Sequence, residues 1–207
     1  MPDRAPSPAT ALVRAERADL GLAFTDTRYW RRSQQTETLH APVDLLRWCA
    51  KEGVLDAASV GRLEARWAEA PAEATARFAE GLALRETIYR VFEAQAGGKV
   101  APAGDLVAFN KALAQAPRRA TLEPDADAYA WRIEVPHDIS GILAAVLWTS
   151  GDLLASPRRN RVRRCANPQC GGIFLDDSKS GTRRWCMMSV CGNRAKAHRH
   201  YMKRRKP

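Results

Sequence analysis

Four cysteines near the C-terminus limit what this chain can fold into more than any other feature. They form two pairs, Cys165 with Cys170 and Cys186 with Cys191, with four residues inside each pair and 15 residues between the pairs. Two short loops of this kind can deliver four thiolates to one tetrahedral zinc ion. A module of about 40 residues buries too little apolar surface to fold without such a link. The spacing therefore predicts one Zn²⁺ per chain, bound by all four cysteines.

Two disulfides or an iron–sulfur cluster would use the same four residues. Residues 1–19 hold six charged side chains and no apolar stretch, so we expect no secretion signal and a cytoplasmic protein, where disulfides are rare. The two pairs also resemble zinc ribbons more than the usual cluster spacings. Both alternatives stay open. The fifth cysteine, Cys49, is expected in a hydrophobic core because it falls on an apolar helical stripe.

The net charge of +10 is distributed unevenly. Residues 157–207 contain 15 of the 33 Lys and Arg residues but only two of the 23 acidic ones, so this segment carries +13 and residues 1–156 carry −3. Such a segment attracts polyanions, most often nucleic acid, although a solvated arginine-rich surface would have the same composition. The longest apolar run, from Gly141 to Trp148, is far shorter than the about 20 residues of a membrane-spanning helix, so no membrane partner is expected.

The residues before the basic segment have the periodicity of a mainly helical domain. Apolar residues recur at spacings of three and four from Pro42 to Pro117, which predicts four successive helices. The first starts at Pro42 and the second follows Asp56, while the third is long and ends before Gly97. The period then changes to two at 129–135, which predicts a short hairpin.

The remaining boundaries follow from turn and capping residues. Glu123-Pro124-Asp125 has the chemistry of a turn before the hairpin. Asp138 can cap a last, apolar helix that runs to about Ser156 and is ended by Pro157. The expected fold class is mainly α with a small β-hairpin. Its parts are a loose N-terminus at 1–17, a helical domain at 18–156, a basic linker at 157–164 and a treble-clef-like zinc module at 165–207.

Within the zinc module, residues 173–175 and 182–185 are expected to pair as a hairpin. A helix is then expected from near Cys186 or Gly192 to about Arg205. Because the apolar stripes before Ser156 are continuous, we expect residues 18–156 to fold without the module and without zinc.

Several residues around the cysteines match a known family. Phe174, Asp176 and Ser178, with the segments Arg183-Arg184-Trp185-Cys186 and Cys191-Gly192-Asn193-Arg194-Ala195-Lys196, resemble the CGNR zinc finger. Upstream, residues 22–27 and 39–48 resemble the ABATE domain that usually precedes this finger, so the resemblance covers about residues 18–207. It implies a ligand-binding N-terminal domain and a zinc module that binds DNA, in proteins described as stress-induced transcription regulators.

The basic residues on both sides of the cysteines are the candidate nucleic-acid contacts. The expected last helix has a basic side that can enter a major groove, and the arginine-rich segment before Cys165 can follow phosphates or enter a narrow minor groove. Asn193 and Arg194 have the chemistry to read adenine and guanine, although Asn193 can equally cap the helix. The candidates are Arg158, Arg159, Arg161, Arg163, Arg164, Arg183, Arg184, Asn193, Arg194, Lys196, Arg199, Lys203 and Arg204.

We therefore expect a zinc-dependent DNA-binding transcription regulator with a sensory N-terminal domain. The alternative is an RNA-binding or ribosome-associated zinc protein that uses the same charge. We expect no enzyme, because the sequence has no paired carboxylates, no glycine-rich phosphate loop and no nucleophile with a base. Five residues could line a pocket for an unknown small-molecule ligand, although indole rings at such spacings usually belong to a core. They are Arg28, Trp48, Trp131, His137 and Trp148.

Overall fold

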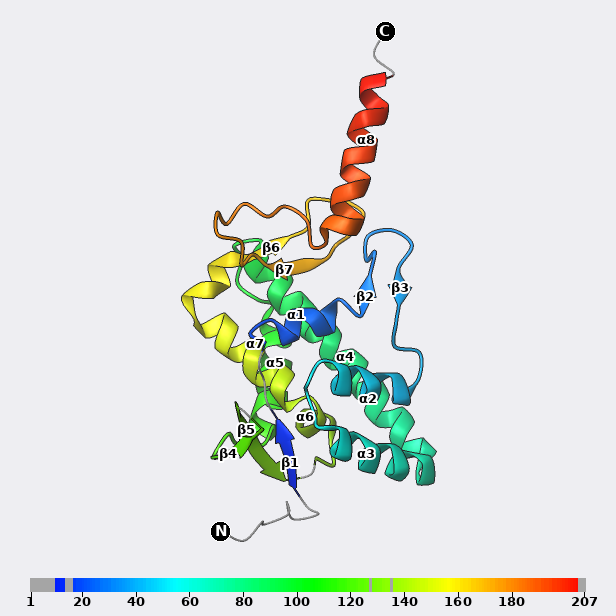
Figure 1. The fold of residues 1–207 in the computed structure, drawn as a ribbon, viewed down its shortest axis with the longest axis vertical. Coiled ribbons are helices and arrows are strands. Elements are labelled where there is room, and N and C mark those ends of the chain that lie inside the picture. Colours follow the sequence, from blue (N-terminus) through cyan, green and yellow to red (C-terminus); the bar gives the residue numbers. More distant parts are fainter. Residues whose placement is uncertain (1–9, 14–16, 127, 135, 205–207) are drawn as a thin grey trace.

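The structure, a computed structural model, describes residues 10–13, 17–126, 128–134 and 136–204 (Figure 1). The helices are α1 (Leu20–Thr25), α2 (Pro42–Lys51), α3 (Ala57–Glu69), α4 (Pro71–Ala96), α5 (Ala103–Gln115), α6 (Ile139–Ile142), α7 (Ala144–Ala155) and α8 (Asn193–Arg204). The strands are β1 (Thr10–Val13), β2 (Arg28–Tyr29), β3 (Thr36–Glu37), β4 (Thr121–Asp125), β5 (Ala128–Glu134), β6 (Val162–Arg164) and β7 (Ile173–Leu175). A 3₁₀-helix covers Pro157–Arg161 and a π-helical turn covers Met188–Gly192. The fold is mainly helical, as predicted.

Helices α2 to α5 form where the spacing of apolar residues predicts them. Pro42 and Pro71 occupy the first turns of α2 and α4, where the N–H that proline lacks has no helical partner. Helix α3 follows Asp56, whose carboxylate accepts a hydrogen bond from the N–H of Ser59 at 2.8 Å. Cys49 of α2 is fully buried in the core, as expected, and this burial raises the pKa of its thiol.

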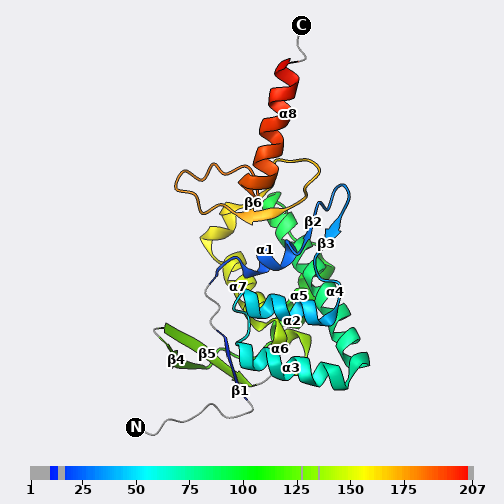
Figure 2. The ribbon, with the colours of Figure 1, turned by 45° about the vertical axis from the view of Figure 1, so that its right-hand side comes forward.

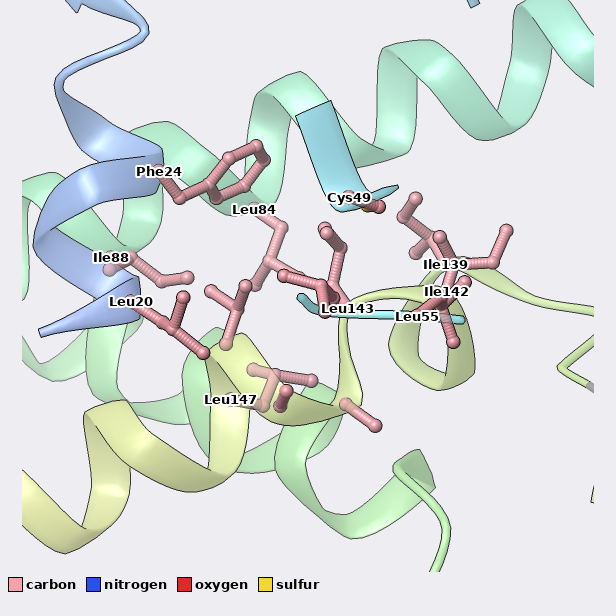
Figure 3. Close-up of a cluster of buried hydrophobic side chains, with 14 of the residues drawn as sticks. Leu20, Phe24, Cys49, Leu55, Leu84, Ile88, Ile139, Ile142, Leu143 and Leu147 are labelled. Atoms are coloured by element: carbon pink, nitrogen blue, oxygen red, sulfur yellow. The ribbon is translucent and has the colours of Figure 1, made fainter. Parts of the chain in front are cut away.

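The hydrophobic core lies between α1, α4 and α7 (Figure 3). Leu20 and Phe24 of α1, Ile88 of α4 and Leu147 of α7 are fully buried there. Helix α4 is 26 residues long and contacts α1, α2, α3 and α5, so it connects the two ends of the molecule (Figure 1). Helix α4 also helps to position the metal site.

The sheet at the end opposite α8 corrects two expectations about its strands (Figure 2). It has three antiparallel strands in the order β1-β5-β4, and β1 comes from the segment predicted to be loose. Ala11 and Val13 are buried, so burial on the core face offsets the entropy lost by ordering this strand. Pro124 lies in β4 rather than in a turn; β4 is an edge strand, where a missing N–H is tolerated. Residues 1–9, 14–16 and Val135 lie outside the described residues.

The predicted last helix is interrupted. It divides into α6 and α7 at Leu143, whose φ of −99° and ψ of 22° are not helical. Asp138 caps α6 as predicted, because its carboxylate accepts a hydrogen bond from the N–H of Gly141 at 2.8 Å. Pro157 follows the end of α7 and also begins the 3₁₀-helix.

The segment described as a linker is ordered, and it replaces the predicted partner of β7. Strand β6 pairs with β7 in antiparallel register, with Val162 opposite Leu175 and Arg164 opposite Ile173. Val162, Ile173 and Leu175 of this hairpin join the main hydrophobic core, which explains why β6 is preferred over the polar residues 182–185. The zinc module and the helical domain therefore share one core.

Candidate metal centre and nucleic-acid interface

The four predicted zinc ligands lie together. Their sulfur atoms are all within 4.8 Å of one another; Cys170 Sγ lies 3.6 Å from Cys186 Sγ, and Cys186 Sγ lies 3.8 Å from Cys191 Sγ. A tetrahedron with Zn–S bonds of about 2.3 Å has sulfur–sulfur edges of about 3.8 Å. A disulfide would need about 2.05 Å, and all four residues are free cysteines. The donor set and its spacing fit one zinc ion.

Different elements bring the four ligands to this point. Cys165 follows β6 and Cys170 precedes β7, so the first pair lies at one end of the hairpin. Cys191 lies in the π-helical turn that leads into α8, and Cys186 precedes that turn. The N–H of Cys165 donates to the carbonyl of Gly172 at 2.9 Å, which closes the first loop. The metal ligands thus fix both the hairpin and the start of α8.

The electrostatics of the cluster also favour a cation. Hydrogen bonds from the thiols of Cys170 and Cys186 lower the pKa of Cys165, so one thiolate is held easily. Donating these hydrogen bonds to Cys165 raises the pKa of Cys170 and of Cys186, because each donor thiol must keep its proton, and repulsion from the neighbouring thiolate adds to this effect. A divalent metal removes this repulsion and allows all four sulfurs to be thiolates.

Asp176 holds the loop between the two cysteine pairs. Its buried carboxylate accepts hydrogen bonds from the hydroxyl and the N–H of Ser178 and from the N–H of Arg183, and these bonds lower its pKa. The guanidinium of Arg161 closes the same loop by donating to the carbonyl groups of Asp176 and Ser178. The loop is therefore built around residues that the family resemblance singles out.

Comparison with known families agrees with this geometry. A family model described as "CGNR zinc finger" matches residues 161–204. A second model, ABATE, described as "Putative stress-induced transcription regulator", matches residues 18–157. The chain belongs to the ABATE family. No curated protein matches the chain. None of the helices in the described part of the chain is long and apolar enough to cross a membrane.

The loop between Cys165 and Cys170 is called here the first knuckle of the CGNR zinc finger. The ABATE domain binds it through the loop between β2 and β3. The N–H of Arg31 donates to the carbonyl of Cys170 at 2.9 Å, and the hydroxyl of Ser33 donates to the carbonyl of Gln169 at 3.3 Å. From α4, the hydroxyl of Tyr89 donates to the carbonyl of Gly171 at 2.9 Å. Gly171 has a φ of 67°, and an added Cβ would lie only 3.0 Å from Arg31 Cβ, so only glycine suits this contact.

Trp30 of the same loop packs against the cysteine cluster. Trp30 adopts a φ of 55°, a left-handed conformation that costs about 1–3 kcal/mol for a residue other than glycine. The guanidinium carbon of Arg194, in the first turn of α8, lies 4.1 Å from the centroid of the Trp30 ring. Residues 30–33 were not among the candidates from the sequence; the run Tyr-Trp-Arg-Arg at 29–32, two aromatic residues followed by two cationic ones, was the available signal.

The arginine arm, residues 158–164, is bound largely to the protein itself. Its five arginines each donate at least one hydrogen bond, and among the described residues only Arg158 has a carboxylate partner, that of Asp177. The others donate to backbone carbonyl groups: Arg159 to that of Ser156, Arg161 to those of Asp176 and Ser178, Arg163 to that of Asn160, and Arg164 to that of Glu93. Backbone carbonyl groups do not neutralise a guanidinium, so the arm keeps most of its positive charge while its side chains are held in place.

The other candidates divide into bound and free side chains. Arg183 donates to the carbonyl groups of Trp185 and Cys186 and lies over the ring of Phe174, so it is structural. Arg184, Arg194 and Lys196 are exposed, and within the described residues their side chains make no hydrogen bond or ion pair, although the guanidinium groups of Arg184 and Arg194 contact indole rings. The side chains of Arg199, Lys203 and Arg204 lie outside the described part of α8.

Asn193 does not cap α8 in the expected way. It is the first residue of the helix, and its side-chain amide donates to the carbonyl of Ser189 at 3.0 Å. An N-cap asparagine would instead accept a hydrogen bond from a backbone N–H of the first turn. Its exposed side chain therefore strengthens the π-helical turn that carries Cys191.

The structure does not bring the five candidate pocket residues together. Trp48 packs on Phe24, His137 contacts Arg66, and the indole N–H of Trp148 donates to the carbonyl of Pro117. Trp131 lies in β5 and packs against the core. Arg28 alone of the five lines the groove of about 480 Å³ between the β2–β3 segment and α4.

A buried charge network forms the floor of this groove. The guanidinium of Arg85 is almost fully buried and donates to both carboxylate oxygens of Glu37, at 2.7 and 2.6 Å. Glu86 accepts hydrogen bonds from Arg85 and from Arg31, at 3.1 and 2.6 Å. One arginine within an apolar stripe gives little sign of partners 48 residues away.

Proposed function

We propose that this protein is a DNA-binding transcription regulator whose nucleic-acid interface depends on zinc. The observation that carries the proposal is the position of α8. This helix begins next to Cys191 and projects away from the rest of the molecule (Figures 1 and 2). A projecting helix with exposed cations in its first turn has the form of a major-groove reader.

The distribution of free and bound cations supports separate roles within the interface. Arg184, Arg194 and Lys196 are exposed around the start of α8 and can contact phosphates or bases. The side chains of the arginine arm are held by hydrogen bonds, mostly to backbone carbonyl groups, and therefore present a fixed positive surface. Zinc is required in this proposal because it fixes the direction of α8 relative to the exposed cations and to the arginine arm.

A salt series tests the proposal directly. Affinity for a random duplex DNA should fall steeply with salt, with a slope of log affinity against log salt of about −4.5 if five phosphates are contacted. The triple variant R184A/R194A/K196A should flatten this slope. The matched variant R47A/K111A/R118A removes the same charge from exposed positions of the ABATE domain and should retain most of it. Zinc content must be equal in both.

Two outcomes would change the conclusion. Equal slopes for the two triple variants would show that binding depends on net charge and not on this interface. If RNA competes much better than DNA at equal salt, and selection from random duplexes yields no preferred site, the RNA-binding alternative replaces the DNA proposal.

A sensory role for the ABATE domain forms the second part of the proposal. The groove beside Arg28 is connected to the zinc finger, because Glu86 on its floor binds Arg31 and the backbone of Arg31 holds Cys170. A ligand that pairs with Arg28 or Glu86 would act on this connection. A thermal-shift screen of charged small molecules should give ligands for the wild-type protein that are lost in Arg28→Ala; the absence of any such ligand would contradict this role.

A further inference from the structure

We propose that the CGNR zinc finger holds one unstacked nucleotide, base and phosphate together, in a cavity beside the metal site. This inference rests on nucleic-acid binding by the zinc finger and assigns it a second mode of contact. The cavity has a volume of about 730 Å³, within the range of about 300–1,000 Å³ of small-molecule sites. It is lined by residues 167–169 of the first knuckle, by Arg184 and Trp185, and by Arg194 and Ala195 of α8.

The chemistry of the lining fits a nucleotide better than a simple anion. Two guanidinium groups are each held against an indole ring: Arg184 lies 5.4 Å from the Trp185 ring centroid, and Arg194 lies 4.1 Å from that of Trp30. Planar guanidinium and indole groups are the surfaces on which unpaired bases stack, and guanidinium also binds phosphate. No acidic residue lines the described cavity, so nothing opposes a phosphate there.

One carboxamide is available to read the edge of the base. Asn167 is already used, because its amide donates to Cys191 Sγ at 3.9 Å and its oxygen accepts from the N–H of Gln169 at 3.1 Å. The side chain of Gln169 is exposed and has no hydrogen-bond partner among the described residues. Glutamine offers both a donor and an acceptor, as the edge of every base requires.

The walls are fixed before a ligand arrives. The N–H of Ala166 donates to the carbonyl of Arg184 at 2.8 Å, which fixes the wall formed by Arg184 and Trp185 relative to the first knuckle. The first knuckle is in turn bound to the ABATE domain through the hydrogen bond from Arg31 to Cys170. Little ordering entropy remains to be lost on binding, which favours affinity for a single nucleotide.

The test compares two labelled duplexes of the same sequence, one fully paired and one with a single bulged nucleotide, by fluorescence anisotropy at fixed salt. The wild-type protein should bind the bulged duplex at least about fivefold more tightly, the lower end of what base stacking contributes. Arg184→Lys keeps the charge but removes the planar group, and Gln169→Ala removes the carboxamide. Both should abolish the preference. Gln169→Ala, which changes no charge and lies outside the cations of the proposed interface, should leave binding to the paired duplex unchanged.

Lys179→Ala provides the matched control, because it removes an exposed charge from the same module outside the cavity. It should weaken binding to both duplexes alike and leave the preference intact. Repeating the measurement with the same two duplexes made of DNA and of RNA identifies which nucleic acid supplies the nucleotide. A preference for the bulged duplex with either DNA or RNA supports the site. Equal binding of bulged and paired duplexes, together with a steep salt dependence, would overturn the nucleotide site and leave the proposed function standing. Absence of binding to every probe would overturn both.

Discussion

The backbone N–H of Arg31 donates a hydrogen bond to the carbonyl oxygen of Cys170 at 2.9 Å, so a loop of the ABATE domain holds a metal ligand of the zinc finger. Trp30 lies beside it against the cysteine cluster, and Arg194 of α8 stacks on Trp30. These three contacts together connect the ABATE domain to the metal site and to the helix proposed to contact DNA. Any change in the β2–β3 loop is expected to reach α8 by this route.

Removal of zinc should destabilise the whole chain and not only the zinc finger. Structural zinc contributes about 10–16 kcal/mol in small modules, and here the hairpin that precedes two of its ligands packs in the common core. We expect one zinc per chain by elemental analysis and a large fall in melting temperature with a chelator. Cys49→Ala should retain one zinc, whereas Cys170→Ala should retain none. Iron, or an unchanged melting temperature in chelator, would contradict the assignment.

Ile173→Ala should lower the free energy of unfolding by about 2–4 kcal/mol, since it leaves a cavity in a core shared by the two parts. Urea unfolding followed by circular dichroism measures this loss. Val100→Ala, at a position 89% exposed, should change the stability by less than about 0.5 kcal/mol.

A truncation ending at Ser156 should also be less stable than the full chain. If the truncated domain unfolds at the same urea concentration as the intact protein, the shared core contributes nothing.

Glu37→Gln should cost about 1–3 kcal/mol at pH 7, because it neutralises one of the two carboxylates that pair with the buried guanidinium of Arg85, the other being that of Glu86. Burial alone would raise the pKa of Glu37, but hydrogen bonds from Arg85 and from the N–H groups of Leu39 and Thr38 outweigh it and lower the pKa below 4.5. The contribution of the carboxylate is therefore full above pH 4.5 and is lost as the pH falls through the lowered pKa.

The difference in stability between wild type and Glu37→Gln should shrink accordingly in acid. Denaturant unfolding at pH 7 and at pH values below 4.5 measures this directly. Glu80→Gln is the control, because Glu80 pairs with Arg77 at the surface and should give a change near zero at every pH. A pH-independent difference for Glu37 would show that the cost comes from packing and not from the ion pair.

Trp30→Ala should leave zinc bound but speed its removal. The indole packs against the cluster, so its loss opens a path for a chelator without removing a ligand. The rate of zinc transfer to a chromogenic chelator should rise several-fold, while Tyr29→Ala, at an exposed neighbouring position, should have no such effect. Equal rates for the wild type and both variants would place the access path elsewhere.

Local patterns predicted the helices and the metal ligands well. Capping by Asp56, proline at the first turn of α2 and the paired cysteines each act through neighbours close in sequence. The spacing of the cysteines is sufficient for the zinc site because tetrahedral coordination leaves few alternatives.

The errors about strands β1 and β6 involve contacts between distant segments. Strand β1 depends on β5, more than a hundred residues later, and β6 competes with residues 182–185 for the edge of β7. A three-residue strand such as β6 has almost no period of its own, so its pairing is decided by the burial of Val162 in the core. The role of the β2–β3 loop could not be predicted from its own residues, because that role depends on contacts with the zinc finger, which is far away in the sequence.

If α8 enters a major groove as proposed, its dimensions determine how much of a DNA sequence it can contact. Its 12 residues make a rod about 18 Å long, since each helical residue rises about 1.5 Å. On B-form DNA this covers about five base pairs at about 3.4 Å each, half of one helical turn. A second chain on a repeated half-site would lengthen the recognition sequence, and the distance between the half-sites would then report how two copies are arranged.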